Sequence, residues 1–171
     1  IRISNTVDAY AVNGWESMKL ENHSGIVDNY RFPKGDPEVM ARYNAPLYLA
    51  VKMNRKVVST GDTTLVDTYI VNEKNLKGSY ILNLVAKDES GNVVASHKER
   101  VTVKGGNDYG QCLQSGWAFI PKSKGYTRIE ASLLKGKTEL VKGDDLLFAV
   151  ELNTKGITTR GSVADTTGAL V

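Results

Sequence analysis

The segment from residue 79 to residue 104 constrains the fold more than any other part of the chain. Two runs of alternating apolar and polar residues, SYILNLVAK (79–87) and NVVASHKERVTVK (92–104), flank the tetrapeptide DESG. A period of two residues is that of a strand, and Gly91 is free to adopt the positive φ that a tight turn requires. The segment therefore predicts a β-hairpin with one face buried.

Further runs of strand type occur on both sides of this hairpin, separated by Gly, Asn and Asp. They are PLYLAVK (46–52), TTLVDTYIVN (63–72), GWAFIP (116–121), YTRIEASLL (126–134) and DLLFAVELN (145–153). No segment after Asn44 has a helical period. We therefore predict an all-β fold, an immunoglobulin-like antiparallel β-sandwich of about seven strands over residues 46–152. Its core should include Leu82, Leu84, Phe148 and Val150.

The first 45 residues are expected to form loops and one short helix. Asp36 suits a helix N-cap and Pro37 the first helical position, while Pro46 prevents continuation beyond Asn44. The helix should span residues 37–43, and a helix this short needs a surface to pack on. We expect its apolar residues, Val39, Met40 and Tyr43, to dock on the sandwich.

Nearer the N-terminus, the apolar run at residues 9–12 predicts a brief strand. Its backbone groups need partners, and we expect the most N-terminal residues to be held by another copy of the chain or a crystal neighbour.

Composition excludes several classes of function. The chain has 22 basic and 19 acidic residues, a net charge of +3, and no run of five like charges, which argues against a nucleic-acid partner. No apolar stretch approaches the roughly 20 residues needed to cross a bilayer, so we expect no membrane partner. The N-terminus has neither a signal-peptide core nor an initiator Met, which fits a processed or excised segment.

Residues that often bind metals or act as nucleophiles are few. The spacing of His23, His97 and Cys112 matches no zinc pattern, so we expect no metal and no cofactor. We interpret Cys112 as a buried structural residue and His97 as a half-exposed strand residue. The tripeptide NHS at Asn22 fits an N-glycosylation acceptor, a pattern that is common by chance.

Four carboxylates are candidates for acid–base groups. Glu16 and Glu21 are interpreted as solvated loop residues, because Glu is usually exposed. Asp144 and Asp145 follow VKG and are interpreted as a turn before a strand, not as a catalytic pair.

Several motifs in order carry a resemblance to a known family. GIVD (25–28), YR (30–31), PK (33–34) and the following helix with Tyr43 resemble the end of the catalytic barrel in glycoside hydrolase family 2, the family of β-galactosidases, β-glucuronidases and β-mannosidases. NGWE (13–16) resembles the last barrel strand. Residues 61–94 and LLFAVEL (146–152) resemble the immunoglobulin-like domain after that barrel, and residues 160–171 resemble the start of a further module.

This resemblance implies three parts: residues 1–45 as a barrel remnant, 46–152 as the sandwich, and 153–171 as a linker or further module. It implies a non-catalytic accessory domain that braces the barrel of an enzyme hydrolysing O-glycosidic bonds. The acid/base and nucleophile of such enzymes lie on earlier barrel strands, so no catalytic residue is assigned here. Trp15 is the one candidate for sugar contact, in the parent enzyme only.

The resemblance also implies partners and a location. The partners are the remainder of the parent chain and its carbohydrate substrate, with a homo-oligomer also possible, and the location is a bacterial periplasm or the exterior. The alternative function is that of a carbohydrate-binding module, with Tyr109, Trp117 and Tyr126 as candidate aromatic contacts. A cell-surface adhesion sandwich is a third class, which would not need the barrel-like residues before Asn44.

Overall fold

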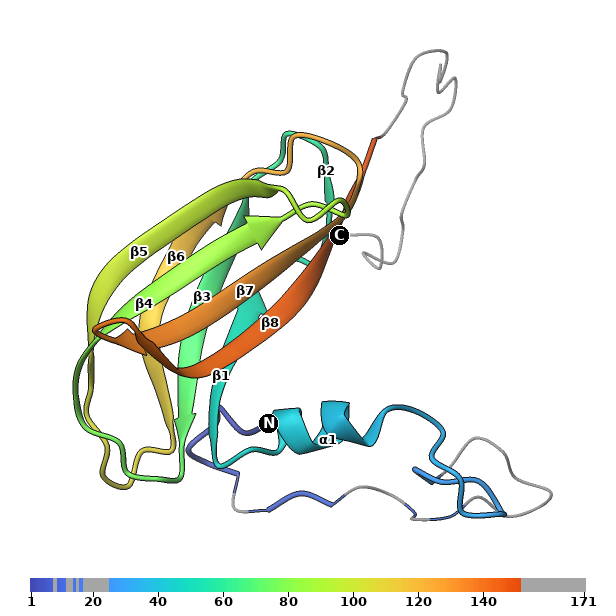
Figure 1. The fold of residues 1–171 in the computed structure, drawn as a ribbon. Coiled ribbons are helices and arrows are strands. Elements are labelled where there is room, and N and C mark those ends of the chain that lie inside the picture. Colours follow the sequence, from blue (N-terminus) through green and yellow to red (C-terminus); the bar gives the residue numbers. More distant parts are fainter. Residues whose placement is uncertain (8, 12–13, 15, 17–24, 152–171) are drawn as a thin grey trace, which may run out of the picture.

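The computed structural model describes residues 1–7, 9–11, 14, 16 and 25–151. One helix, α1 (Pro37–Tyr43), precedes eight strands (Figure 1). The strands are β1 (Leu47–Met53), β2 (Val57–Ser59), β3 (Thr64–Asn72), β4 (Gly78–Lys87), β5 (Val93–Val103), β6 (Gly110–Phe119), β7 (Gly125–Lys135) and β8 (Thr138–Val150).

The strands form two facing sheets, which confirms the predicted all-β sandwich. The smaller sheet has the order β1-β3-β6, and the larger has the order β2-β8-β7-β4-β5. Every pairing is antiparallel except that of β2 with β8, which is parallel. With β1 and β2 divided between the sheets, this is the Greek-key arrangement of immunoglobulin-like sandwiches. Strand β2 was not predicted, because three residues are too short to show a period.

The core lies between the sheets and is built by the predicted alternation. Tyr80, Leu82, Leu84 and Ala86 on β4 are all buried, and they face an interior that includes Val66 and Ile70 of β3. The two sheets approach each other closely where Leu49 of β1 lies against Gly143 of β8. A Cβ atom on Gly143 would lie 1.7 Å from the backbone oxygen of Leu49, so only glycine fits at this point.

The prediction that Phe148 and Val150 lie in the core is wrong. Phe148 is 36% exposed and Val150 is only half-buried, while Leu147 and Ala149 fill the interior. The reason is that residues 146–150 are apolar on both faces of β8, so alternation alone does not decide which face turns inward.

Helix α1 begins and ends where the sequence predicts. The Asp36 carboxylate accepts a hydrogen bond of 2.9 Å from the Glu38 backbone N–H, and the Asn44 N–H donates to Met40 O at 3.0 Å. None of the helical residues is buried.

The predicted docking of α1 is only partly right. Tyr43 packs edge-on against Tyr48 of β1 with ring centroids 5.5 Å apart, but Val39 and Met40 remain 42% and 36% exposed. Figure 1 shows why: α1 approaches the end of the sandwich with its C-terminal end, and the preceding loop extends away from the sheets.

The predicted strand at residues 9–12 is not observed. Residues 9–11 are not in a strand, and Val12 lies outside the described residues. Within the chain itself, Arg2 binds Glu73 and Asn5 binds Gly110 of the sandwich, and the expectation that another copy holds the N-terminus stays a prediction.

Candidate interaction surfaces

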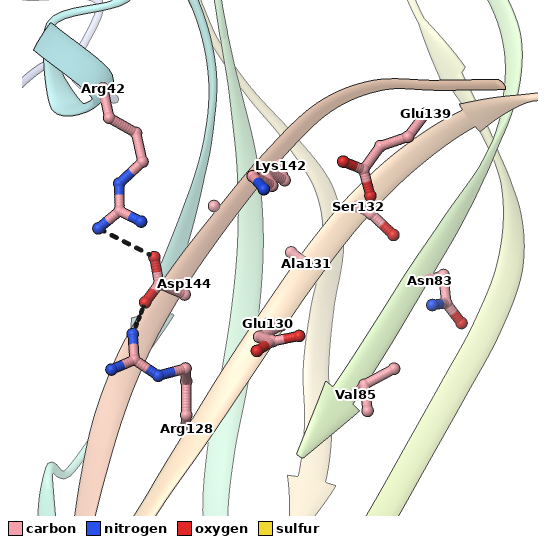
Figure 2. A pocket seen from close by; sticks show the side chains of 11 residues that line it. Arg42, Asn83, Val85, Arg128, Glu130, Ala131, Ser132, Glu139, Lys142 and Asp144 are labelled. Atoms are coloured by element: carbon pink, nitrogen blue, oxygen red, sulfur yellow. Dashed lines mark hydrogen bonds and ion pairs between the residues drawn. The ribbon is translucent and has the colours of Figure 1, made fainter. Parts of the chain in front are cut away.

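The carboxylate of Asp144 joins α1 to the larger sheet. It pairs with the Arg42 guanidinium of α1 at 3.6 Å, and it accepts a hydrogen bond from Arg128 of β7 (Figure 2). Its side chain is only 10% exposed, whereas the two arginines keep over 40% of their side-chain surface in solvent. We call Arg42, Asp144 and Arg128 the clamp, because they tie the helix to β7 and β8.

The sequence interpretation of Asp144 and Asp145 as a turn is wrong, since both lie within β8. The glycine before them serves the close approach of β1, not a turn. The two carboxylates have separate cationic partners: Asp145 pairs with Lys56 at 2.6 Å.

A second set of contacts ties the N-terminus to the same end of the sandwich. The Arg2 guanidinium donates to the backbone oxygens of Tyr43 and Ala45 and pairs with Glu73 at 2.7 Å. The side chain of Asn5 both donates to and accepts from the backbone of Gly110, at 2.9 Å each way. The Arg2 contacts hold the junction between α1 and β1, and the Asn5 contacts tie the N-terminal segment to the start of β6.

The loop before α1 is ordered by its own hydrogen bonds. The Asp28 carboxylate accepts from the backbone N–H groups of Tyr30 and Phe32 at 2.8 and 2.9 Å. Arg31 adopts φ 69°, a region that non-glycine residues rarely occupy. Tyr30 and Phe32 are thereby presented to solvent, 75% and 68% exposed.

An apolar groove of about 620 Å³ lies between this loop and α1. Val27 and Pro33 form one side, and Val39 and Met40 form the other. No sandwich residue lines it among the described residues. We call this the helix groove.

Residues singled out from the sequence are not brought together by the fold. Trp15, Glu21, Asn22 and His23 lie outside the described residues. Glu16 is exposed and forms a loose ion pair with Arg31, with 3.8 Å between the charged atoms. This agrees with its interpretation as a solvated loop residue.

Cys112 is exposed, so its interpretation as a buried residue is wrong. That interpretation rested on the general tendency of free cysteines to be buried. In the structure the register of β3 with β6 shifts on either side of Thr68, and Cys112 lies on β6 next to this irregularity. Partial burial of the sulfur and the nearby Asp67 carboxylate raise the pKa of the Cys112 thiol. A thiol whose pKa is raised is a poorer nucleophile at neutral pH.

His97 is half-exposed, as expected, and stacks on Trp117 with ring centroids 6.2 Å apart. The three aromatic candidates for sugar contact have different environments. Trp117 packs against the core, Tyr109 is exposed in the loop before β6, and Tyr126 is exposed on β7 beside Phe148. Only Tyr126 therefore combines exposure with an aromatic neighbour on a sheet.

Neither a metal site nor a membrane span is found in the described part of the chain. No group of three His, Cys, Asp or Glu side chains there is placed to hold a metal ion. No described helix has the length and apolar character to cross a membrane.

Sequence comparison finds no matching protein-family model and no matching curated protein. Comparison with solved structures finds chains of glycosyl hydrolase family 2. A member from Bacteroides cellulosilyticus matches 60% of this chain with 18% identity and a TM-score of 0.46. A β-glucuronidase from Bacteroides uniformis matches 59% with 17% identity and a TM-score of 0.44. The aligned region spans 15% and 13% of those two chains. A CARDB domain from Pyrococcus furiosus, solved with di-metal ions, matches 62% of this chain with 15% identity and a TM-score of 0.42.

Proposed function

We propose that this chain is a non-catalytic accessory domain of a family 2 glycoside hydrolase, joined to the closing segment of that enzyme's barrel. Residues 1–45 belong to the barrel, residues 46–152 form the sandwich, and residues 153–171 lead into a linker or further module. The parent enzyme hydrolyses O-glycosidic bonds, as β-galactosidases do. This chain braces the barrel and supplies no catalytic carboxylate.

The single observation that carries the proposal is the unfilled helix groove. A short helix is stabilised chiefly by packing its apolar face, yet Val39 and Met40 stay exposed beside an apolar groove. Its sandwich contacts are instead made by Arg42 and Tyr43 at its C-terminal end. A helix fastened at one end, with its apolar side chains unburied, fits a helix that completes another domain.

The motifs that resemble the barrel end support the same proposal. The motifs occur in the order Gly25–Asp28, Tyr30-Arg31, Pro33-Lys34 and α1, and only three residues, Asn44 to Pro46, separate α1 from β1. The clamp and the Arg2 contacts hold that junction on both sides. A rigid junction transmits the orientation of one domain to the next, which is the bracing role. Trp15 keeps its proposed place as a sugar contact in the parent enzyme.

The polypeptide that precedes Ile1 provides the direct test. An Asn-Glu acid/base followed by a second Glu nucleophile on predicted barrel strands is expected there. A preceding sequence without such a pair would overturn the proposal.

The purified 171-residue chain should hydrolyse no nitrophenyl glycoside, since the carboxylate pair is assigned to the barrel. Turnover that disappears when one of this chain's own carboxylates is replaced would contradict the assignment.

A matched pair of variants tests the bracing role in the polypeptide that carries the barrel. Val39→Asp places a charge in the helix groove, and we expect it to lower the temperature at which glycosidase activity is lost. Val94→Asp is the control, because Val94 is equally exposed, at 43%, but lies on β5 away from α1. Equal effects of both substitutions would contradict a barrel contact at α1.

A further inference from the structure

The outer face of the larger sheet carries an exposed aromatic pair. Tyr126 of β7 and Phe148 of β8 are register partners, with ring centroids 4.7 Å apart, and are 53% and 36% exposed. Val57 of β2 pairs with Phe148 on its other side and is 62% exposed. We call Tyr126 and Phe148 the aromatic platform. Contiguous exposed apolar side chains, unlike singly scattered ones, are a feature of ligand-binding surfaces.

A polar groove lies on the same face, farther along the same strands. It has a volume of about 280 Å³ and is lined by residues of β4, β7 and β8 and by Arg42 of α1 (Figure 2). Outward positions on β7 alternate, so Tyr126, Arg128, Glu130 and Ser132 form one row from the platform to the groove. Six residues of strand span roughly 20 Å, which is long enough for several consecutive sugar rings.

The groove offers hydrogen bonds without a net charge. Its lining has three positive and three negative side chains, namely Arg42, Arg128 and Lys142, and Glu130, Glu139 and Asp144. The Asp144 carboxylate forms ion pairs with Arg42 and Arg128, and the Glu130 carboxylate forms one with Lys87 at 2.7 Å. The side chains of Asn83 and Ser132 have no hydrogen-bond partner among the described residues. This set suits a neutral ligand that is rich in hydroxyl groups better than an anion or a cation.

We propose that this face binds a neutral polysaccharide, with a sugar ring stacked on the aromatic platform and neighbouring sugars in the polar groove. A pyranose presents C–H groups on its face and hydroxyl groups around its rim, which matches an aromatic surface beside uncharged donors and acceptors. The function is additional to bracing, because the platform lies on strands of the sandwich and shares no residue with the helix groove.

Affinity electrophoresis of the 171-residue chain tests the proposal. The gels contain barley β-glucan, xyloglucan, galactomannan or arabinogalactan, with polygalacturonate as the anionic comparison. We expect retardation by at least one neutral polysaccharide, and at least tenfold weaker retardation for Tyr126→Ala and Phe148→Ala. Tyr109→Ala is the matched control, since Tyr109 is 54% exposed but lies in the loop before β6, and it should bind as the unmodified chain does.

Each other outcome overturns the proposal. Absence of retardation in all four neutral gels would do so, and so would retardation by polygalacturonate alone or equal loss in Tyr109→Ala. Light scattering of the same proteins tests whether a second copy of the chain occupies the platform instead. If the unmodified chain is a dimer and Tyr126→Ala is a monomer, the platform is an interface between copies. Circular dichroism confirms that each variant is folded. Failure here leaves the bracing role intact, because that role is tested through Val39.

Discussion

Tyr48 lies at the point where α1 meets the sandwich. It is 8% exposed, its ring contacts Tyr43, and the carboxylates of Asp144 and Asp145 lie near enough to act on its phenol. Burial, followed by the influence of Tyr43 and Asp144, raises the pKa of Tyr48 above its usual range. The folded protein therefore favours the neutral phenol more than the unfolded chain does.

This shift predicts a loss of stability in alkali. Below the ordinary tyrosine pKa of about 10 the contribution of Tyr48 is fully present, and it declines as the pH rises above that value because only the unfolded chain ionises. Urea unfolding from pH 8 to pH 11 should show Tyr48→Phe gaining stability relative to the unmodified protein. Parallel curves for the two proteins would contradict the shift.

Leu84 provides a test of the core, because it is one of several fully buried leucines. It is fully buried on β4, so Leu84→Ala leaves a cavity and should lower the free energy of unfolding by about 2–5 kcal/mol. Leu65→Ala is the matched control, because Leu65 on β3 is 44% exposed, and it should change stability by less than about 1 kcal/mol. Urea denaturation measures both, and similar losses would mean that Leu84 is not a core residue.

The sequence could identify Leu82 and Leu84 as core residues because the polar residues of β4, Ser79, Asn83 and Lys87, all fall on the opposite face of the strand. It could not do so for β8, where Leu146 to Val150 are all apolar and only the pairing partners decide the buried face. The side chains of the clamp were missed for a different reason. Arg42, Arg128 and Asp144 are far apart in sequence, and no local pattern predicts their meeting.

Among the elements, α1 depends most on contacts outside itself. Its ends follow from local chemistry, namely the Asp36 cap and the proline at residue 46, so its bounds could be predicted from sequence. Its orientation could not, because that is set by Arg42, Asp144 and the Tyr43–Tyr48 contact. Such a helix should loosen before the strands do.

Asp144→Asn tests this dependence. Losing the carboxylate removes its ion pair with Arg42, and we expect roughly tenfold faster amide exchange at Asn44, whose N–H caps α1. Asp145→Asn is the control, because Asp145 pairs with Lys56 and not with the helix. Unchanged exchange at Asn44 in Asp144→Asn would show that the clamp does not hold α1.

At the scale of the whole molecule, the main hydrophobic cluster of the described residues lies within the sandwich, and Val27 in the loop before α1 is buried outside that cluster. Every residue of the main hydrophobic cluster lies at or beyond Leu49, and α1 contributes no buried residue. The N-terminal segment is attached by polar contacts and one aromatic pair. Stability should therefore be unevenly distributed along the chain.

Amide hydrogen exchange in the 171-residue chain should report this division. Amides of residues 25–36 should exchange quickly, and those of β3 and β4 slowly, because only the strands belong to the cooperative core. A chain beginning at Pro46 should still unfold cooperatively in urea. Uniformly slow exchange from residue 25 onward in a monomer would mean that this segment belongs natively to the sandwich, and the barrel assignment would fail.

The parallel pairing of β2 with β8 has a mechanical consequence. The two strands have three register pairs, from Val57–Phe148 to Ser59–Val150. A hydrogen bond of 2.8 Å lies at each end of this pairing, from Phe148 N to Lys56 O and from Thr60 N to Val150 O. Tension applied through the chain on either side of the sandwich would draw β2 backward and β8 forward along their own axes. These bonds would then be loaded together in shear, whereas an antiparallel pair pulled from one end would separate one bond at a time. We therefore expect the sandwich to yield abruptly, at a high force, when the two ends of the chain are pulled apart.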